Sequence, residues 1–138
     1  MVGVDGSSTA RQALRWAVEE ARVRRASLEV VSVWQLPYLG EFPYTDAVLD
    51  PSLLESEARK ELDEMVDSVD TSALHQPVKR LLSSGGAAAT LLDAAEGADV
   101  LVVGSRGLGG FKGLLLGSVS HQVSHHASCP VVVVPPER

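Results

Sequence analysis

The chain has 138 residues, of which 45% are hydrophobic, and a formal net charge of −6. This length fits one globular domain over residues 1–138, which can bury about two-thirds of the surface that its unfolded chain exposes. The acidic balance argues against nucleic acid or an anionic membrane as the main partner, because both are bound largely through Lys and Arg. Any phosphate group would have to be held by a local site.

A single cysteine, Cys129, excludes an internal disulfide, and the first residues lack the basic and apolar segments of a signal peptide. No apolar run approaches the ~18 residues that are needed to span a bilayer. From these features we expect a cytoplasmic protein with no membrane partner.

Short runs rich in valine and leucine recur along the chain and have the length of buried strands. Longer segments, in which apolar residues follow a helical period, separate these runs. The first helical segment begins after Ser7 and Ser8, either of which is placed to cap it. The strand-like runs cover residues 2–4, 28–34, 78–82, 100–103 and 131–134, and the helical segments cover residues 10–21, 54–69, 88–95 and 119–127.

This alternation of strands and helices predicts an α/β fold, with a parallel sheet covered by helices on both faces and joined by right-handed crossovers. In open sheets of this kind, ligands bind beyond the carboxyl ends of the strands, where the winding direction reverses. Residues from four different strand ends are therefore expected to converge there. They are Asp5, Val33, the pair Gly85-Gly86 and Gly104.

A glycine-rich segment follows the fourth strand. Gly104 and Gly107 are followed, after nine residues, by Gly117 and Ser118 at the start of the last helix. Because glycine lacks a Cβ, its backbone N–H can approach an anion closely, and the first N–H groups of a helix are unpaired and partly positive. The segment therefore predicts a phosphate site for a nucleotide. By itself, the pattern also fits a flexible loop with a glycine helix cap.

Two other nucleotide signatures do not fit this segment. The Walker pattern is absent, because Lys112 lies between Phe111 and Gly113 instead of following a glycine and preceding Ser or Thr. A dinucleotide fingerprint would need its third glycine where Lys112 stands, and it belongs to the first strand-to-helix turn. A dinucleotide is therefore not the expected ligand.

The spacing Gly104-x2-Gly107-x9-Gly117-Ser118 resembles the ATP-binding motif of the universal stress protein family. The resemblance extends along the whole chain, because the first two strands, the third turn with its helix, and the last strand also look like those of the family. The segments that carry this resemblance are residues 2–7, 28–34, 85–92 and 128–135.

The resemblance implies an adenine nucleotide alpha-hydrolase-like sheet with strand order 3-2-1-4-5 and ATP, with or without Mg²⁺, over the gap between strands one and four. It implies that Asp5 and Val33 face the adenine. The residues that it assigns to the ribose and phosphates are Gly104, Arg106 and Gly107, and those that it assigns to the triphosphate at the helix start are Gly117, Ser118, Val119 and Ser120.

The last strand is expected at an edge of this sheet. Four consecutive valines on an open edge form a template for pairing with another chain, because their outer backbone groups are unpaired. A symmetric pairing with a second copy would satisfy those groups, and the family resemblance implies the same twofold homodimer. The residues concerned are Val131, Val132, Val133 and Val134.

Several other residues have two interpretations. Asp5 fits a nucleotide ligand but also a turn carboxylate that caps the first helix. Arg106 and Lys112 fit either phosphate contacts or a solvated surface. His121 and His125 have a spacing that could bind zinc, yet no third ligand is evident. We therefore expect them to be solvated or, with His126, to favour the C-terminal end of the helix dipole.

Four of the aromatic residues lie in one stretch that starts at the end of the second strand and runs on to Asp50 without clear secondary structure. They are Trp34, Tyr38, Phe42 and Tyr44. This stretch could form a lid, a partner surface or simple packing. Cys129 is expected to be a small buried hydrophobic residue.

These features predict a cytoplasmic ATP-binding stress-response protein that acts through nucleotide-dependent conformation and an unidentified regulatory protein partner. No catalytic or metal-binding residue is assigned, because phosphoryl transfer needs carboxylates for Mg²⁺ and none accompanies the glycines. Two alternatives remain at this point: a slow ATPase or nucleotide transferase, and a nucleotide-free dimeric interaction module.

Overall fold

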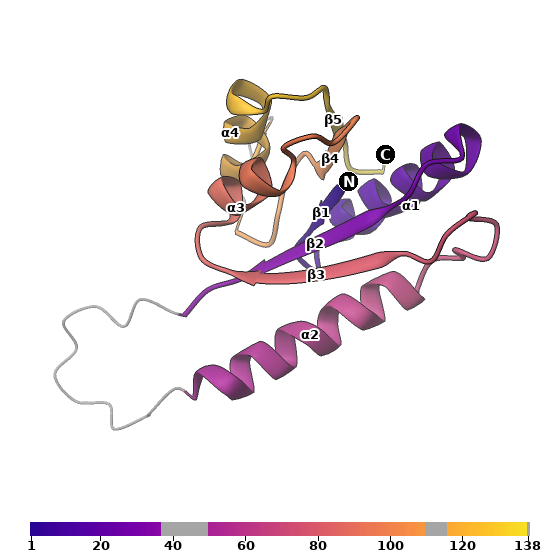
Figure 1. Ribbon diagram of the computed structural model, residues 1–138. Helices are drawn as coiled ribbons and strands as arrows, with labels where there is room; N and C mark the ends of the chain where they lie inside the picture. Colours follow the sequence, from indigo (N-terminus) through magenta and orange to yellow (C-terminus); the bar gives the residue numbers. More distant parts are fainter. Residues whose placement is uncertain (37–49, 110–115, 138) are drawn as a thin grey trace, which may run out of the picture.

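The structure, a computed structural model, describes residues 1–36, 50–109 and 116–137. Its strands form one parallel sheet in the order β3-β2-β1-β4-β5, which confirms the order that the family resemblance implies (Figure 1). The elements are β1 (Val2–Val4), α1 (Ser8–Arg24), β2 (Glu29–Trp34), α2 (Pro51–Asp67), β3 (Lys79–Ser84), α3 (Ala87–Ala94), β4 (Leu101–Gly104), α4 (Ser118–His126) and β5 (Val131–Val134).

The helices cover both faces of the sheet, with α3 and α4 on one side and α1 and α2 on the other (Figure 1). Alternate residues of a strand therefore belong to different cores: Val102 packs with α1 and α2, whereas its neighbours Leu101 and Val103 pack with α3 and α4. Because both faces are buried, the strands read as continuous apolar runs and not as alternating ones.

The start of α1 is fixed by its N-cap, and its alanines allow it to lie close to the sheet. Ser7 has extended backbone angles and its Oγ accepts a hydrogen bond from the Ala10 N–H at 3.1 Å. The buried stripe of α1 includes Ala13, Leu14 and Ala17. As a result, the first turn of α1 lies directly beside the carboxyl ends of β1 and β4.

The strand β5 lies at an edge of the sheet and pairs with β4 alone. The Leu101 N–H donates to the Pro130 carbonyl at 3.0 Å, and the Ser105 N–H donates to the Val134 carbonyl at 2.8 Å. Because strand backbones alternate in direction, the backbone groups of Val131 and Val133 point away from β4. The free edge therefore presents those two residues.

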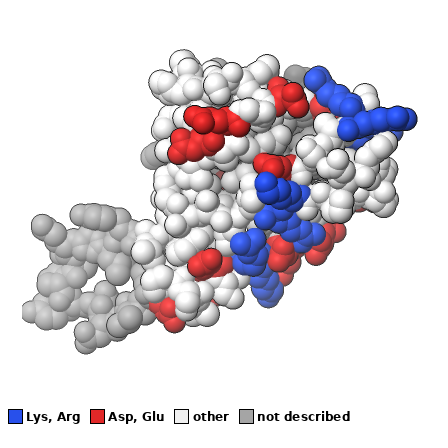
Figure 2. Space-filling view, viewed as in Figure 1, with Lys and Arg blue, Asp and Glu red and all other residues white. Residues whose placement is uncertain are grey.

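Charged side chains of both signs are interspersed on the visible face of the molecule, which shows no continuous basic surface (Figure 2). One ion-pair cluster joins α2 to β3, where the Arg80 guanidinium donates to Asp63 at 2.8 Å and to Asp67 at 2.5 Å.

None of the described helices combines the length and apolar character of a membrane span. The predicted aromatic connection, with Tyr38, Phe42 and Tyr44, lies outside the described residues, as does Lys112.

Candidate functional site

A cavity of about 590 Å³ opens at the carboxyl ends of β1, β2 and β4. Its size lies within the range of about 300–1,000 Å³ that is usual for small-molecule sites. All nine residues that the family resemblance assigns to the nucleotide line it, so the fold brings together positions more than 100 residues apart. They are Asp5, Val33, Gly104, Arg106, Gly107, Gly117, Ser118, Val119 and Ser120. The pair Gly85-Gly86, which was also expected at this edge, is not among the lining residues.

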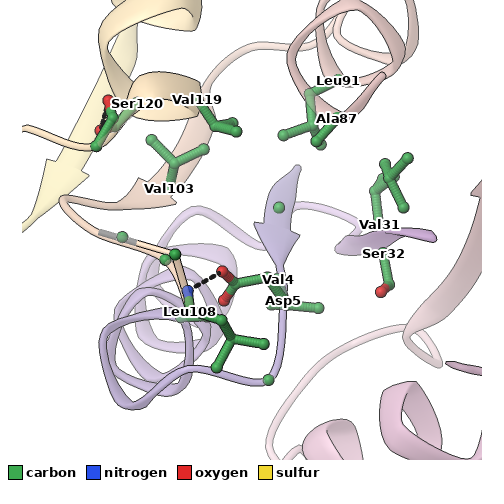
Figure 3. Close-up of a pocket in the computed structure, with 18 of the residues that line it drawn as sticks. Val4, Asp5, Val31, Ser32, Ala87, Leu91, Val103, Leu108, Val119 and Ser120 are labelled. Carbon is green, nitrogen blue, oxygen red and sulfur yellow. Dashed lines mark hydrogen bonds between the residues drawn. The ribbon is translucent and has the colours of Figure 1, made fainter. Parts of the chain in front are cut away.

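One part of the cavity is apolar. In the close-up, Val103 and Val119 lie on one side of it, and Ala87, Leu91 and Val31 lie on the other (Figure 3). Residues of α2 also line the cavity, although their helical period in the sequence indicated only a helix. They line the cavity because α2 packs across β2 and β3, and they are Ala58, Glu61, Leu62 and Met65.

The Asp5 carboxylate joins the start of α1 to the loop after β4 at the mouth of this cavity. Its Oδ1 accepts a hydrogen bond from the Ser7 N–H at 3.1 Å. This is the contact expected of a turn carboxylate, one of the two interpretations of Asp5 drawn from the sequence. Its Oδ2 accepts from the Leu108 N–H at 3.0 Å, across 103 positions of sequence (Figure 3). A Cβ on Gly107 would lie 2.3 Å from the same Oδ2, so only glycine leaves room for this contact.

A second connection runs from α1 to the loop after β4. The Thr9 hydroxyl donates to the Arg106 carbonyl, and Thr9 is buried. Gly104 lies directly against it, because a Cβ on Gly104 would approach the Thr9 carbonyl carbon and Oγ1 to 2.9 Å. Gly104 is therefore required for helix packing, a role that its sequence context did not indicate.

The start of α4 has no side-chain cap. Its N-cap is Gly117, which cannot cap the helix with a side chain, and no described acceptor meets the first-turn N–H groups of Ser118, Val119 and Ser120. By contrast, α1 is capped by Ser7 and α2 by Asp50. Three adjacent N–H donors at the positive end of a helix dipole therefore border the cavity.

Other groups at this helix start are already paired. The Gly117 N–H donates to the Ser105 carbonyl at 2.7 Å. The Ser120 hydroxyl is buried and donates toward the carbonyls of Ser105, at 2.9 Å, and Gly117, at 3.0 Å. Only the backbone N–H of Ser120 thus remains available for a ligand, whereas the Ser118 side chain is exposed.

The remaining candidate residues lie away from the cavity. His121 and His125 are exposed on α4, with ring centroids 4.4 Å apart, and His126 ends that helix. Cys129 is half-buried and packs against the core that contains α3 and α4.

The model of the universal stress protein family matches residues 1–135. The chain belongs to this family. Among curated relatives, the universal stress protein Rv2005c of Mycobacterium tuberculosis is 36% identical over 133 residues, which cover 96% of this chain and 44% of that protein. This universal stress protein chain thus spans less than half the length of the mycobacterial relative.

Another relative, the universal stress protein YxiE of Bacillus subtilis, is 32% identical over 142 residues, and the match covers 97% of this chain and 96% of that protein. Among solved structures, a universal stress protein in complex with cAMP superimposes with a TM-score of 0.72 and 26% identity. That match covers 97% of this chain and 93% of the other. Sequence and structure comparisons therefore agree on the family.

Proposed function

We propose that this universal stress protein chain binds ATP in the cavity and acts in a stress response through nucleotide-dependent conformation and a protein partner. The observation that carries the proposal is the uncapped first turn of α4, whose N–H groups border the cavity beside the loop that contains Gly104 and Gly107. Helix N-termini of this kind bind phosphates well, because unpaired donors and the helix dipole act together. Arg106, also in the lining, has no carboxylate partner among the described residues and adds a positive charge nearby.

The apolar part of the cavity supports an adenine base as the other end of the ligand. Val33 on β2, with Val31 and Leu91 on the same face of the sheet, offers apolar surface against which a flat ring can pack. The related structure in complex with cAMP supports an adenine nucleotide as the ligand class. ATP is preferred over cAMP in the proposal because the first turn of α4 offers several adjacent donors for a chain of phosphates.

Calorimetric titration of nucleotide-free protein with ATP, ADP, AMP, cAMP and GTP tests the proposal, with and without Mg²⁺ because no metal ligand is assigned to the chain. We expect ATP to bind most tightly and affinity to fall by about tenfold or more when the terminal phosphates are removed, since each charge-assisted hydrogen bond contributes about 1.5–3 kcal/mol. Failure of every adenine nucleotide to bind at millimolar concentration would contradict it.

We also propose a homodimer through the free edge of β5, where the four valines are half-buried in the single chain. An antiparallel pairing of β5 with its twin would use the outward N–H and carbonyl groups of Val131 and Val133 and cover the edge. This is the same homodimer that the sequence predicts. The pairing of β5 with β4 now identifies the backbone groups of Val131 and Val133 as those that would contact the second copy.

Val133→Pro is expected to shift the protein toward monomer, because proline removes an N–H that points to solvent and is tolerated on edge strands. Val132 is unsuitable for this test, since its backbone faces β4 and its side chain packs against the α1 core. Light scattering coupled to gel filtration measures the mass. A monomeric wild type at micromolar concentration, or a variant dimer as tight as the wild type, would contradict the interface.

A further inference from the structure

We infer that Asp5 is a positioning residue that holds the loop after β4 in the shape that receives phosphates. This inference rests on the proposed binding of ATP in the cavity. It differs from the expectation drawn from the family resemblance, in which Asp5 faces the adenine. The two roles make opposite predictions for ligands with and without phosphates.

The hydrogen bonds of Asp5 carry the inference. Each carboxylate oxygen already accepts from a backbone N–H, Oδ1 from Ser7 at 3.1 Å and Oδ2 from Leu108 at 3.0 Å. Ser7 in turn caps α1 through its Oγ. The carboxylate therefore links the loop after β4 to the start of α1, which is part of a regular helix.

The space around Gly107 is an independent observation. A Cβ at this position would lie 2.3 Å from Asp5 Oδ2, so the loop can pack against the carboxylate in this way only with glycine here. The neighbouring Arg106 carbonyl is tied to the same helix by the Thr9 hydroxyl. On the opposite side, the Ser105 carbonyl accepts from the Gly117 N–H at the start of α4.

The loop is thus held on one side by the start of α1 and on the other by the start of α4. A loop that is ordered before the ligand arrives loses less conformational freedom on binding, and this raises affinity without any direct contact. Removal of the carboxylate frees the Leu108 end of the loop. The loss should then fall on the part of the ligand that this loop receives, which is the phosphate part.

The test compares Asp5→Ala with the wild type by NMR titration of adenosine and of ATP. We expect the Kd for ATP to rise about tenfold, as for loss of one hydrogen bond to a charged group, and the Kd for adenosine to change less than about twofold. Asp70→Ala is the matched control, because the Asp70 carboxylate accepts from the Ser72 N–H at 2.9 Å in a similar turn outside the cavity. It should alter neither Kd.

Amide hydrogen exchange of Leu108 in the ligand-free protein gives a readout that needs no nucleotide. Asp5→Ala should speed this exchange about tenfold, whereas Asp70→Ala should leave it unchanged. Equal losses for adenosine and ATP, or no loss for either, would overturn the positioning role. If the wild type binds neither ligand, the proposed function itself fails, and the exchange result alone then shows whether Asp5 orders the loop.

Discussion

Gly117→Asp is expected to stabilise the fold and to abolish ATP binding at the same time. Gly117 is the N-cap of α4, with extended angles of φ −74° and ψ 167°, and a Cβ there makes no contact closer than 3.4 Å. Aspartate is a favoured N-cap, so the free energy of unfolding should rise by a few tenths of a kcal/mol. Its carboxylate would accept the first-turn N–H groups that the proposal gives to phosphate, and its charge would repel the ligand.

The expected loss of ATP affinity is about 100-fold or more, because two charge-assisted hydrogen bonds at about 1.5–3 kcal/mol each are lost. Gly86→Asp is the matched control. Gly86 is the N-cap of α3, it also lacks a side-chain cap, and a Cβ there meets nothing within 4 Å. Thermal unfolding and calorimetry give the two quantities. If Gly86→Asp weakened ATP binding more than Gly117→Asp, the phosphates would belong at α3.

Gly104→Val is expected to destabilise the protein by about 2–3 kcal/mol, whatever its effect on nucleotide binding. A Cβ at this position would lie 2.9 Å from the carbonyl carbon of Thr9, and a helix backbone cannot move aside as a flexible side chain can. Denaturant unfolding of the ligand-free protein measures the change.

Gly109→Val is the control for this prediction, because Gly109 lies in the same loop and a Cβ there meets nothing within 4 Å. Its effect on the free energy of unfolding should stay within about 0.5 kcal/mol. Equal stability of Gly104→Val and the wild type would show that α1 does not pack against β4 as the structure has it.

The sequence predicted most of the fold because buried parallel strands and amphipathic helices leave clear patterns. The apolar run at residues 100–103 predicts a strand, and β4 covers Leu101–Gly104. The third strand was placed at residues 78–82, whereas β3 extends to Ser84, because it pairs with β2 as far as Trp34. Serines carry no strand signal, so only the pairing partner determines that end.

The candidate site was predicted in part. The glycines and the helix start follow each other in one segment, so a local motif was sufficient to find them. The contact of Asp5 with Leu108 and that of Gly104 with Thr9 join residues that are far apart in sequence. The sequence showed the residue types but not these partners, and the partners change the expected effect of each substitution.

Mass spectrometry of the nucleotide released when freshly purified protein is denatured tests the central claim most directly. Our account predicts an adenine nucleotide, mainly ATP, in near-stoichiometric amount from the wild type, and almost none from Gly117→Asp purified in parallel. Wild-type protein that releases no nucleotide and also fails to retain added ATP would contradict the account, as would equal release of ATP from the variant.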